Sequence, residues 1–152
     1  MVVEIIEAVM TKFEANTTLR TLLGASGRVF YADPDDDPGF ETSPAYLIVY
    51  EGDEGYTEEY IKEDPRIEEP DQEMLCIAVA TTAKLAAQIR DCLRELIFGR
   101  NFETTNYVVR EIEYSGSVAI ANEEKKDRRK RRGCRFVLKG QYRKSERNLN
   151  DW

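Results

Sequence analysis

The sequence predicts an α+β fold in which two α-helices pack on one face of a mainly antiparallel, mixed β-sheet. Three observations lead to this prediction. Two segments have the apolar spacing of amphipathic helices, several shorter segments have the pattern of strands, and the order is helix, strand, strand, long acidic excursion, strand, helix and then strands. The 152 residues suffice for a single core, so we expect one domain at 1–145 and a flexible tail at 146–152.

The first helix is expected over about residues 2–15, where apolar residues recur at steps of four, three and four. These residues are Val2, Ile6, Val9 and Phe13. Residues 16–18 interrupt the pattern, and one more apolar turn at 19–23 ends at Gly24. A short strand is expected at 28–31.

Two buried strands are expected next. Residues 44–50 and 74–80 are near-continuous apolar runs, which suit interior positions in a sheet. Residues 33–39 are so rich in turn formers that no regular element fits there. If both helices lie on one face of the sheet, its other face must be polar or covered by something.

Residues 51–73 form an acidic excursion, with 11 Asp and Glu residues against only Lys62 and Arg66. Its main apolar residues are Tyr56, Tyr60 and Ile61. This apolar surface is too small to offset the entropy of ordering the segment alone. We expect either a long hairpin arm or a partly disordered loop.

A second helix is expected over residues 83–98. Thr81 or Thr82 can cap its N-terminus, and Gly99 supplies the stop. Its buried stripe consists of Leu85, Ile89, Leu93 and either Leu96 or Ile97.

Two alternating segments, 107–114 and 134–142, predict half-buried strands. The second places Cys134, Phe136, Leu138 and Tyr142 on one face and Arg135, Lys139 and Arg143 on the other. Residues 118–120 are a further strand or an extension.

The charge is distributed very unevenly along the chain. Residues 1–75 contain 5 basic and 19 acidic side chains, a balance of −14, whereas residues 76–152 contain 17 basic and 10 acidic side chains, a balance of +7. Such an asymmetry is either neutralised within one copy or presented as two faces that attract the opposite face of another copy.

Residues 125–132 hold seven bases and one acid. Runs of this kind are most often solvated loops, and the alternatives are contact with an acidic surface of a neighbouring protein or with nucleic acid. No aromatic residue is interleaved between Glu123 and Gly133, which weakens the case for stacking on single strands.

The composition excludes several chemistries. The sequence has no His, which removes Ser-His-Asp and Cys-His nucleophiles, His-ligated metal sites and the usual neutral-pH proton shuttle. The cysteines lack C-x-x-C spacing and are expected to be reduced core thiols. They are Cys76, Cys92 and Cys134. With no phosphate-binding Gly loop and no run near 18 apolar residues, we expect no cofactor and no membrane contact.

Two acidic groupings could hold a metal ion, but each lacks part of the required pattern. The Asp residues of 33–37 alternate as in a calcium loop, yet Pro38 and Pro44 stand where Gly and a bidentate Glu are needed. A metal-dependent nuclease could be built from Asp71 and residues 123–125, which are some fifty residues apart. A solvated turn and a charge run are the favoured interpretations.

Several segments carry a resemblance to a known family through their order and spacing. They are residues 19–24 leading to 27–31, the strand 44–50, and residues 77–80 followed by a helix that contains 86–93. From about residue 3 to 143 the chain resembles the tail terminator family (tail-completion, minor tail protein U-like, neck protein) of long-tailed bacteriophages.

The resemblance implies an α+β subunit that assembles into a ring, typically a hexamer, which caps the finished tail tube and forms the joint to the head. Family members are not enzymes, so no catalytic residues are implied. The implied partners are further copies, the tail tube protein and a head-side connector or stopper protein, with DNA passing through the ring without specific binding. The implied location is the virion tail or neck, and the host cytoplasm during assembly.

A chain with an acidic half and a basic half suits the heterologous contacts of a ring. We therefore expect the basic run of one copy to meet the acidic excursion of the next. The candidate interface residues are Lys125, Lys126, Arg128, Arg129, Lys130, Arg131, Arg132, Glu58, Glu59, Glu63 and Asp64. The long 51–73 segment and the 123–132 run depart from the family pattern, so a head-side joining protein stays open. The competing classes are a His-free metal-dependent nuclease and a monomeric nucleic-acid-binding module.

Overall fold

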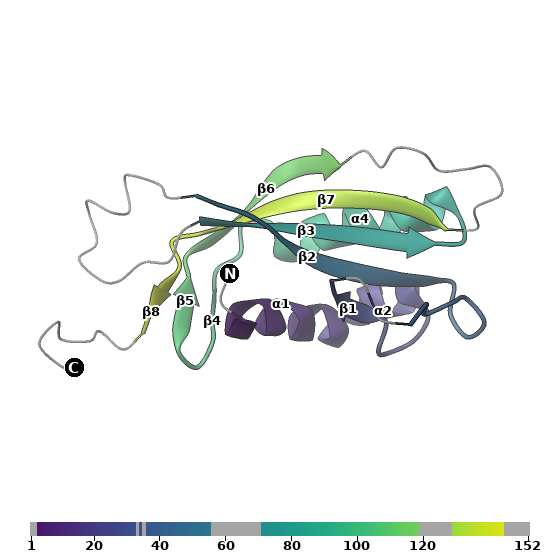
Figure 1. Ribbon diagram of the computed structural model, residues 1–152, viewed down its shortest axis with the longest axis horizontal. Coiled ribbons are helices and arrows are strands. Elements are labelled where there is room, and N and C mark those ends of the chain that lie inside the picture. The colour runs from purple at the N-terminus through teal and green to yellow at the C-terminus, as the bar shows by residue number, and fades with distance from the viewer. Residues whose placement is uncertain (1–2, 33, 35, 56–70, 119–128, 145–152) are drawn as a thin grey trace, which may run out of the picture.

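The described part of the chain contains three helices and two sheets, which confirms the predicted α+β class (Figure 1). The structure, a computed structural model, describes residues 3–32, 34, 36–55, 71–118 and 129–144. The helices are α1 (Val3–Ala15), α2 (Thr17–Leu23) and α4 (Ala83–Ile97). The strands are β1 (Val29–Tyr31), β2 (Ala45–Gly55), β3 (Asp71–Ala80), β4 (Phe102–Glu103), β5 (Tyr107–Val109), β6 (Glu111–Val118), β7 (Lys130–Lys139) and β8 (Tyr142–Arg143).

The larger sheet has five strands in the order β1-β2-β3-β7-β6. β1 runs parallel to β2 and the other neighbouring strands are antiparallel, so the sheet is mixed, as predicted. β2 and β3 extend beyond the apolar runs at 44–50 and 74–80, because their pairing continues to Gly55 opposite Asp71. The acidic excursion therefore begins as an antiparallel pair whose register shifts between Glu51 and Glu54. Residues 56–70 lie outside the described residues.

The smaller sheet, β4-β5-β8, divides two of the predicted strands. Residues 107–114 belong to β5 and β6, which separate at Arg110, and residues 134–142 belong to β7 and β8, which separate at Gly140. The two separation points touch: Gly140 has a φ of 65°, and a Cβ placed there would lie 2.7 Å from the Cδ atom of Arg110. The chain leaves the larger sheet twice at one place, through a non-local contact that strand alternation does not reveal.

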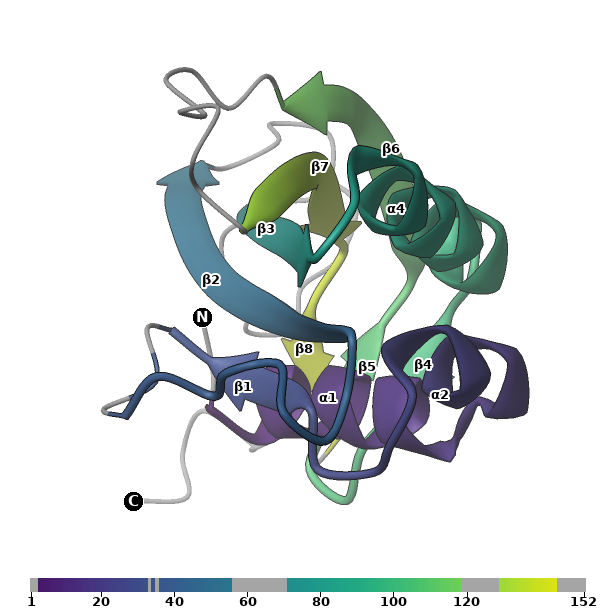
Figure 2. The same ribbon diagram turned by 90° about the vertical axis from the view of Figure 1, so that its right-hand side faces the viewer.

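The helices cover one face of the larger sheet and enclose the core against it (Figure 2). The largest fully buried apolar side chains come from the helices and from the inner face of β2, β3 and β7. They include Phe13, Leu19, Leu47, Met74, Ile89, Leu93, Phe136 and Leu138. Burying an apolar side chain of this size stabilises the fold by about 1.5–3 kcal/mol. The described residues of the two predicted apolar stripes thus pack in or against the core, and Val2 lies outside the described residues.

A third helix, α2, replaces the single apolar turn expected at 19–23. Asn16 begins it, because its side-chain Oδ1 accepts a hydrogen bond from the backbone N–H of Leu19 at 2.9 Å. Leu19 and Leu23 are then buried in the core. The helix ends at Gly24, whose φ of 86° lies in the left-handed region that glycine adopts readily.

We expect Gly24→Ala to destabilise the fold more than Gly27→Ala. Both glycines have positive φ, so each alanine incurs the left-handed penalty of about 1–2 kcal/mol. At Gly24 the new Cβ would also lie 2.6 Å from the Cδ atom of Pro44, whereas at Gly27 it meets nothing within 4 Å. Urea unfolding of the two variants measures the difference, which we expect to be about 1–3 kcal/mol. Equal losses would contradict a close approach at Gly24.

Glu4 ties the first turn of α1 to the β4–β5 connection. Its carboxylate accepts hydrogen bonds from Thr104 Oγ1 at 2.6 Å, from Asn106 Nδ2 at 2.9 Å and from Asn106 N at 3.2 Å. These hydrogen bonds, that from Thr104 above all, lower the pKa of Glu4. A carboxylate with a lowered pKa stabilises the folded state above its unfolded pKa and loses that effect as the pH falls through its folded pKa.

The wild-type chain should therefore lose more stability than Glu4→Gln as the pH falls from about 5 to about 3. Urea midpoints measured across this range for both proteins test the expectation. A difference between them that does not change with pH would show that the charge of Glu4 contributes nothing.

Candidate subunit interface

The face of the larger sheet opposite the helices, called the outer face below, carries a second apolar cluster. Tyr46, Ile48 and Val79 are almost fully buried there. Four half-buried residues pack against them: Phe30, Phe40, Tyr50 and Ile77. The central strands are thus apolar on both faces, which accounts for their near-continuous apolar sequences.

The chain between β1 and β2 covers one part of the outer face. The ring of Phe40 stacks on that of Tyr46 with their centroids 5.8 Å apart, and the guanidinium of Arg28 lies 5.5 Å from the Tyr46 centroid. Arg28 donates hydrogen bonds to the backbone carbonyls of Pro38, Gly39 and Ala45. Burial lowers the pKa of Arg28, but an arginine remains protonated at neutral pH.

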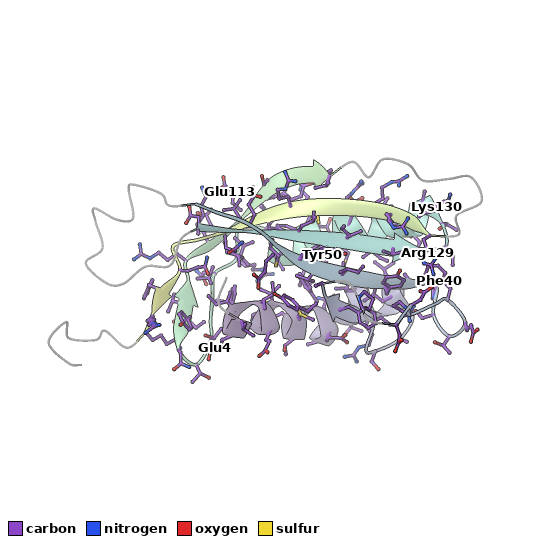
Figure 3. All side chains as sticks on the ribbon, in the orientation of Figure 1. Glu4, Phe40, Tyr50, Glu113, Arg129 and Lys130 are labelled. Carbon is purple, nitrogen blue, oxygen red and sulfur yellow. The ribbon has the colours of Figure 1, made fainter. Side chains whose placement is uncertain are left out.

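Beside this cover lies a groove with a volume of about 350 Å³, called the outer groove below. Its floor comes from β2 and β3, and its sides come from the chain between β1 and β2 and from the beginning of β7. Its lining residues are Pro34, Asp37, Pro38, Tyr46, Ile48, Tyr50, Ile77, Val79, Arg129 and Arg131. Figure 3 shows Phe40 and Arg129 near the same end of the sheet, with Tyr50 farther along β2.

Part of the basic run is the beginning of β7, so the solvated-loop interpretation is wrong for residues 130–132. These residues pair with residues 78–80 of β3. Because successive side chains in a strand point to opposite faces, Arg131 shares the outer face with its partner Val79, and it lines the outer groove. Long side chains at a strand end can keep their charged heads in water while their stems lie on the sheet.

The acidic and basic segments leave the larger sheet at opposite ends (Figure 1). Ala80 lies opposite Lys130 at the end where the basic run enters, and Gln72 lies opposite Leu138 near the end where the acidic excursion departs. Eight residues of strand correspond to about 27 Å. This separation exceeds the Debye length of about 8 Å at physiological ionic strength, so the two anchor points barely sense each other's charge.

Some of the charge is nevertheless neutralised within one copy. Arg129 forms an ion pair with Asp37, and Arg135 Nε lies 3.9 Å from Glu73 Oε2. Both pairs join the basic half of the chain to its acidic half. All four side chains are partly exposed, so each pair is worth at most about 1 kcal/mol.

The other candidate interface residues lie outside the described residues. They are Glu58, Glu59, Glu63, Asp64, Lys125, Lys126 and Arg128. Of the eleven candidates, the structure therefore places only residues 129–132, at one end of the larger sheet. The outer groove adds apolar and aromatic residues that charge counting could not have selected. The signal for them was the two strands with apolar residues on both faces.

The acidic groupings considered as metal sites are placed only in part. Asp37 is engaged by Arg129, and Asp71 is the first residue of β3. Residues 123–125 lie outside the described residues, so the proposed nuclease site of Asp71 with residues 123–125 stays a prediction. Within the described ranges, no three Cys, Asp and Glu side chains gather as a metal site would require.

The three cysteines are free, and two of them face each other in the core. Cys76 and Cys134 are fully buried register partners on β3 and β7, while Cys92 is half-buried on α4. A hydrogen bond with Cys134, together with burial, raises the pKa of the Cys76 thiol well above its ordinary value. A thiol with a raised pKa is a poor nucleophile, in agreement with the predicted core role.

Comparison with known proteins finds a similar fold among solved structures. No protein-family model matches the sequence, and the search of curated proteins finds no match either. Among the described residues, no helix has the length and apolar character needed to cross a membrane. The fold is similar to that of a chain in a solved structure described as the virion of a native gene transfer agent (GTA) particle, with a TM-score of 0.57. The match covers 89% of this chain and 90% of that chain at 14% sequence identity, so what the two chains share is the fold.

Proposed function

We propose that this chain is a structural virion protein, a tail terminator-like subunit whose copies form a ring that caps a phage-like tail tube and joins the tail to the head. The observation that carries the proposal is that the acidic and basic segments are attached to opposite ends of one sheet, the first where Gly55 pairs with Asp71 and the second where Lys130 pairs with Ala80. The fold shared with a chain of a virion structure supports the same setting.

A ring requires one surface of a subunit to contact a different surface of the next. In this chain the segment 125–132 and the segment 51–73 have opposite charge, and their anchor points are about 27 Å apart along the strands. Copies arranged head to tail would bring the basic end of one subunit against the acidic end of the next, and in this arrangement the opposite charges complement each other best. Six copies per ring is the number that the family resemblance suggests.

The remaining contacts of the proposed ring follow from its position. The tail tube protein would bind one side and a head-side connector or stopper protein the other, in the neck of the virion. DNA would pass through the channel without specific binding, because acidic residues that line a channel repel the phosphate backbone. The proposal needs no cofactor and no catalytic residue.

Size-exclusion chromatography with light scattering and negative-stain images of the purified chain test the ring. The decisive measurement is whether the chain restores tail joining to particles that lack it, since assembly can depend on the tail. Restored joining with a ring at the tail end supports the proposal. Failure to restore joining, combined with a monomer at every concentration, would overturn it.

A head-side joining protein of similar size is distinguished by the particle that the chain binds first. A tail terminator should co-sediment with purified headless tails, whereas a head-side protein should co-sediment with filled heads that lack tails. Strong, salt-dependent retention of DNA without binding to either particle would favour a nucleic-acid-binding module instead.

A further inference from the structure

We infer that the outer groove of one copy receives residues 56–64 of a second copy. The inference rests on the proposed ring and names the surfaces that would meet in it. The groove already contains the two kinds of group that a docked peptide segment needs: an apolar floor and charged groups at the side.

The floor of the groove is suited to apolar and aromatic side chains. Ile77 and Tyr50 are half-buried and stand next to the buried Ile48 and Val79. A side chain laid on Ile77 and Tyr50 would remove their remaining apolar surface from water, which stabilises a complex by about 25 cal/mol per Å². Tyrosine is well adapted to such a site because its ring packs on apolar groups while its hydroxyl reaches water.

The side of the groove formed by β7 is suited to carboxylates. Arg129 and Arg131 both line the groove. Arg129 already pairs with Asp37 of its own copy, which shows that a carboxylate can be accommodated at this position. A guanidinium has five N–H donors and can engage several acceptors at once, so an incoming carboxylate need not displace the first.

Residues 56–64 have the matching composition, with the sequence Tyr-Thr-Glu-Glu-Tyr-Ile-Lys-Glu-Asp. Tyr60 and Ile61 supply adjacent large apolar side chains, and Tyr56 supplies a second ring four residues earlier. Glu58 and Glu59 lie between the two rings, so the carboxylates would reach the arginines when the rings reach the floor. The four acids of the segment exceed its single base, which matches the positive side of the groove.

The lengths of chain favour a second copy as the source of the segment. Tyr56 follows Gly55, the last residue of β2, and therefore lies within about 4 Å of it. Ile48, in the groove floor, is seven residues back along β2, or about 23 Å away. Within one copy, Tyr56 therefore cannot reach the part of the groove floor beside Ile48. The groove of a neighbouring copy is free of this limit when the basic end of that copy faces the segment, and the whole segment can then reach the floor.

Photo-crosslinking of the full-length chain tests the inference. A benzophenone amino acid is placed at position 60, and the variant is mixed with isotope-labelled wild-type chain before irradiation. We expect crosslinked peptides that pair position 60 of one chain with residues 77–79 or 129–131 of the differently labelled chain. Crosslinks confined to single chains, or crosslinks that avoid the groove, would overturn the inference.

A peptide-binding measurement covers the case in which the chain is monomeric in solution. A fluorescent peptide of residues 54–66 is titrated with the full-length chain, and saturable binding is expected. Arg131→Glu should weaken it about tenfold or more, because close interfacial charge pairs contribute about 1.5 kcal/mol or more. Arg135→Glu, on the same strand and face but outside the groove, is the matched control and should leave it unchanged. Absence of saturable binding, or equal loss in both variants, would overturn the inference.

These readouts separate the inference from the proposed ring function. If the chain restores tail joining but position 60 never crosslinks to the groove of another copy, the docking inference fails and the ring function stands. If the crosslink between copies forms but tail joining is not restored, the ring function fails and the docking inference stands.

Discussion

A variant that carries Arg129→Glu and Arg131→Glu is expected to fold but to form no rings and to restore no tail joining. Arg129 directly precedes β7 and Arg131 is its second residue, and both line the outer groove, where a second copy would bring its acidic segment. Reversing them replaces attraction by repulsion in at least two charge pairs. At about 1.5 kcal/mol or more for each pair, the affinity between copies should fall about 100-fold or more.

The fold itself should tolerate this change. The ion pair between Arg129 and Asp37 is partly exposed and contributes at most about 1 kcal/mol, so a circular dichroism melt should stay close to that of the wild type. The matched control is Arg135→Glu with Lys139→Glu, which makes the same charge change on the same face of β7 outside the groove. It should assemble normally, and a control that fails equally would point to net charge alone.

Adding Glu58→Arg and Glu59→Arg to the reversed chain should restore assembly in part. The charge pairs formed by these four residues then have their charges exchanged, and attraction between them returns. A chain that carries only Glu58→Arg and Glu59→Arg should lose assembly, like the chain that carries only the two arginine substitutions. Light scattering and the tail-joining assay compare all the variants, and a combined variant no better than its parents would contradict direct contact between the segments.

The elements that could be predicted from the sequence depend on local patterns. α4 shows this clearly: Thr82 caps it by accepting a hydrogen bond from the N–H of Leu85, and Ile89 and Leu93 of the predicted stripe are fully buried. The two central strands were recognisable because their apolar runs are continuous. In these segments, the apolar residues whose spacing predicts the helix or strand are also the residues that pack in the core.

The elements that could not be predicted depend on contacts between distant segments. Two predicted strands each split in two, and the two points of separation, Arg110 and Gly140, lie close together in the fold. Residues 130–132 look like a solvated charge run, yet they continue β7 because β3 offers backbone partners as far as Ala80. Pairing with a long neighbouring strand outweighs the local preference of charged residues for loops.

The candidate interface shows the same division. The acidic and basic segments were visible from charge alone, because charge is a property of single residues. The outer groove could not be predicted in this way, because it exists only where the chain between β1 and β2 folds over Tyr46 and approaches Arg129. Sequence periodicity places residues on a face of a strand, but it does not tell which distant loop will cover that face.

The two faces of β3 should respond oppositely to truncation. Met74 is fully buried against the helices, and Ile77 is half-buried on the outer face, in the floor of the groove. Both side chains lose a similar number of atoms on replacement by alanine. Met74→Ala should lower the free energy of unfolding by about 2–5 kcal/mol, because it leaves a cavity, and the melting temperature by about 4–20 °C. Differential scanning calorimetry of dilute protein measures this loss.

Ile77→Ala should cost a single copy only about 1 kcal/mol, since this side chain is already partly in contact with water. Its larger effect should fall on association, measured as weaker binding of the 54–66 peptide and fewer rings. If the outer face served only the fold, both variants would lower the stability of the single copy to different extents, and neither would weaken assembly specifically. Loss of assembly in Ile77→Ala at nearly wild-type stability would therefore indicate that this apolar floor serves a second chain, and unchanged assembly would contradict it.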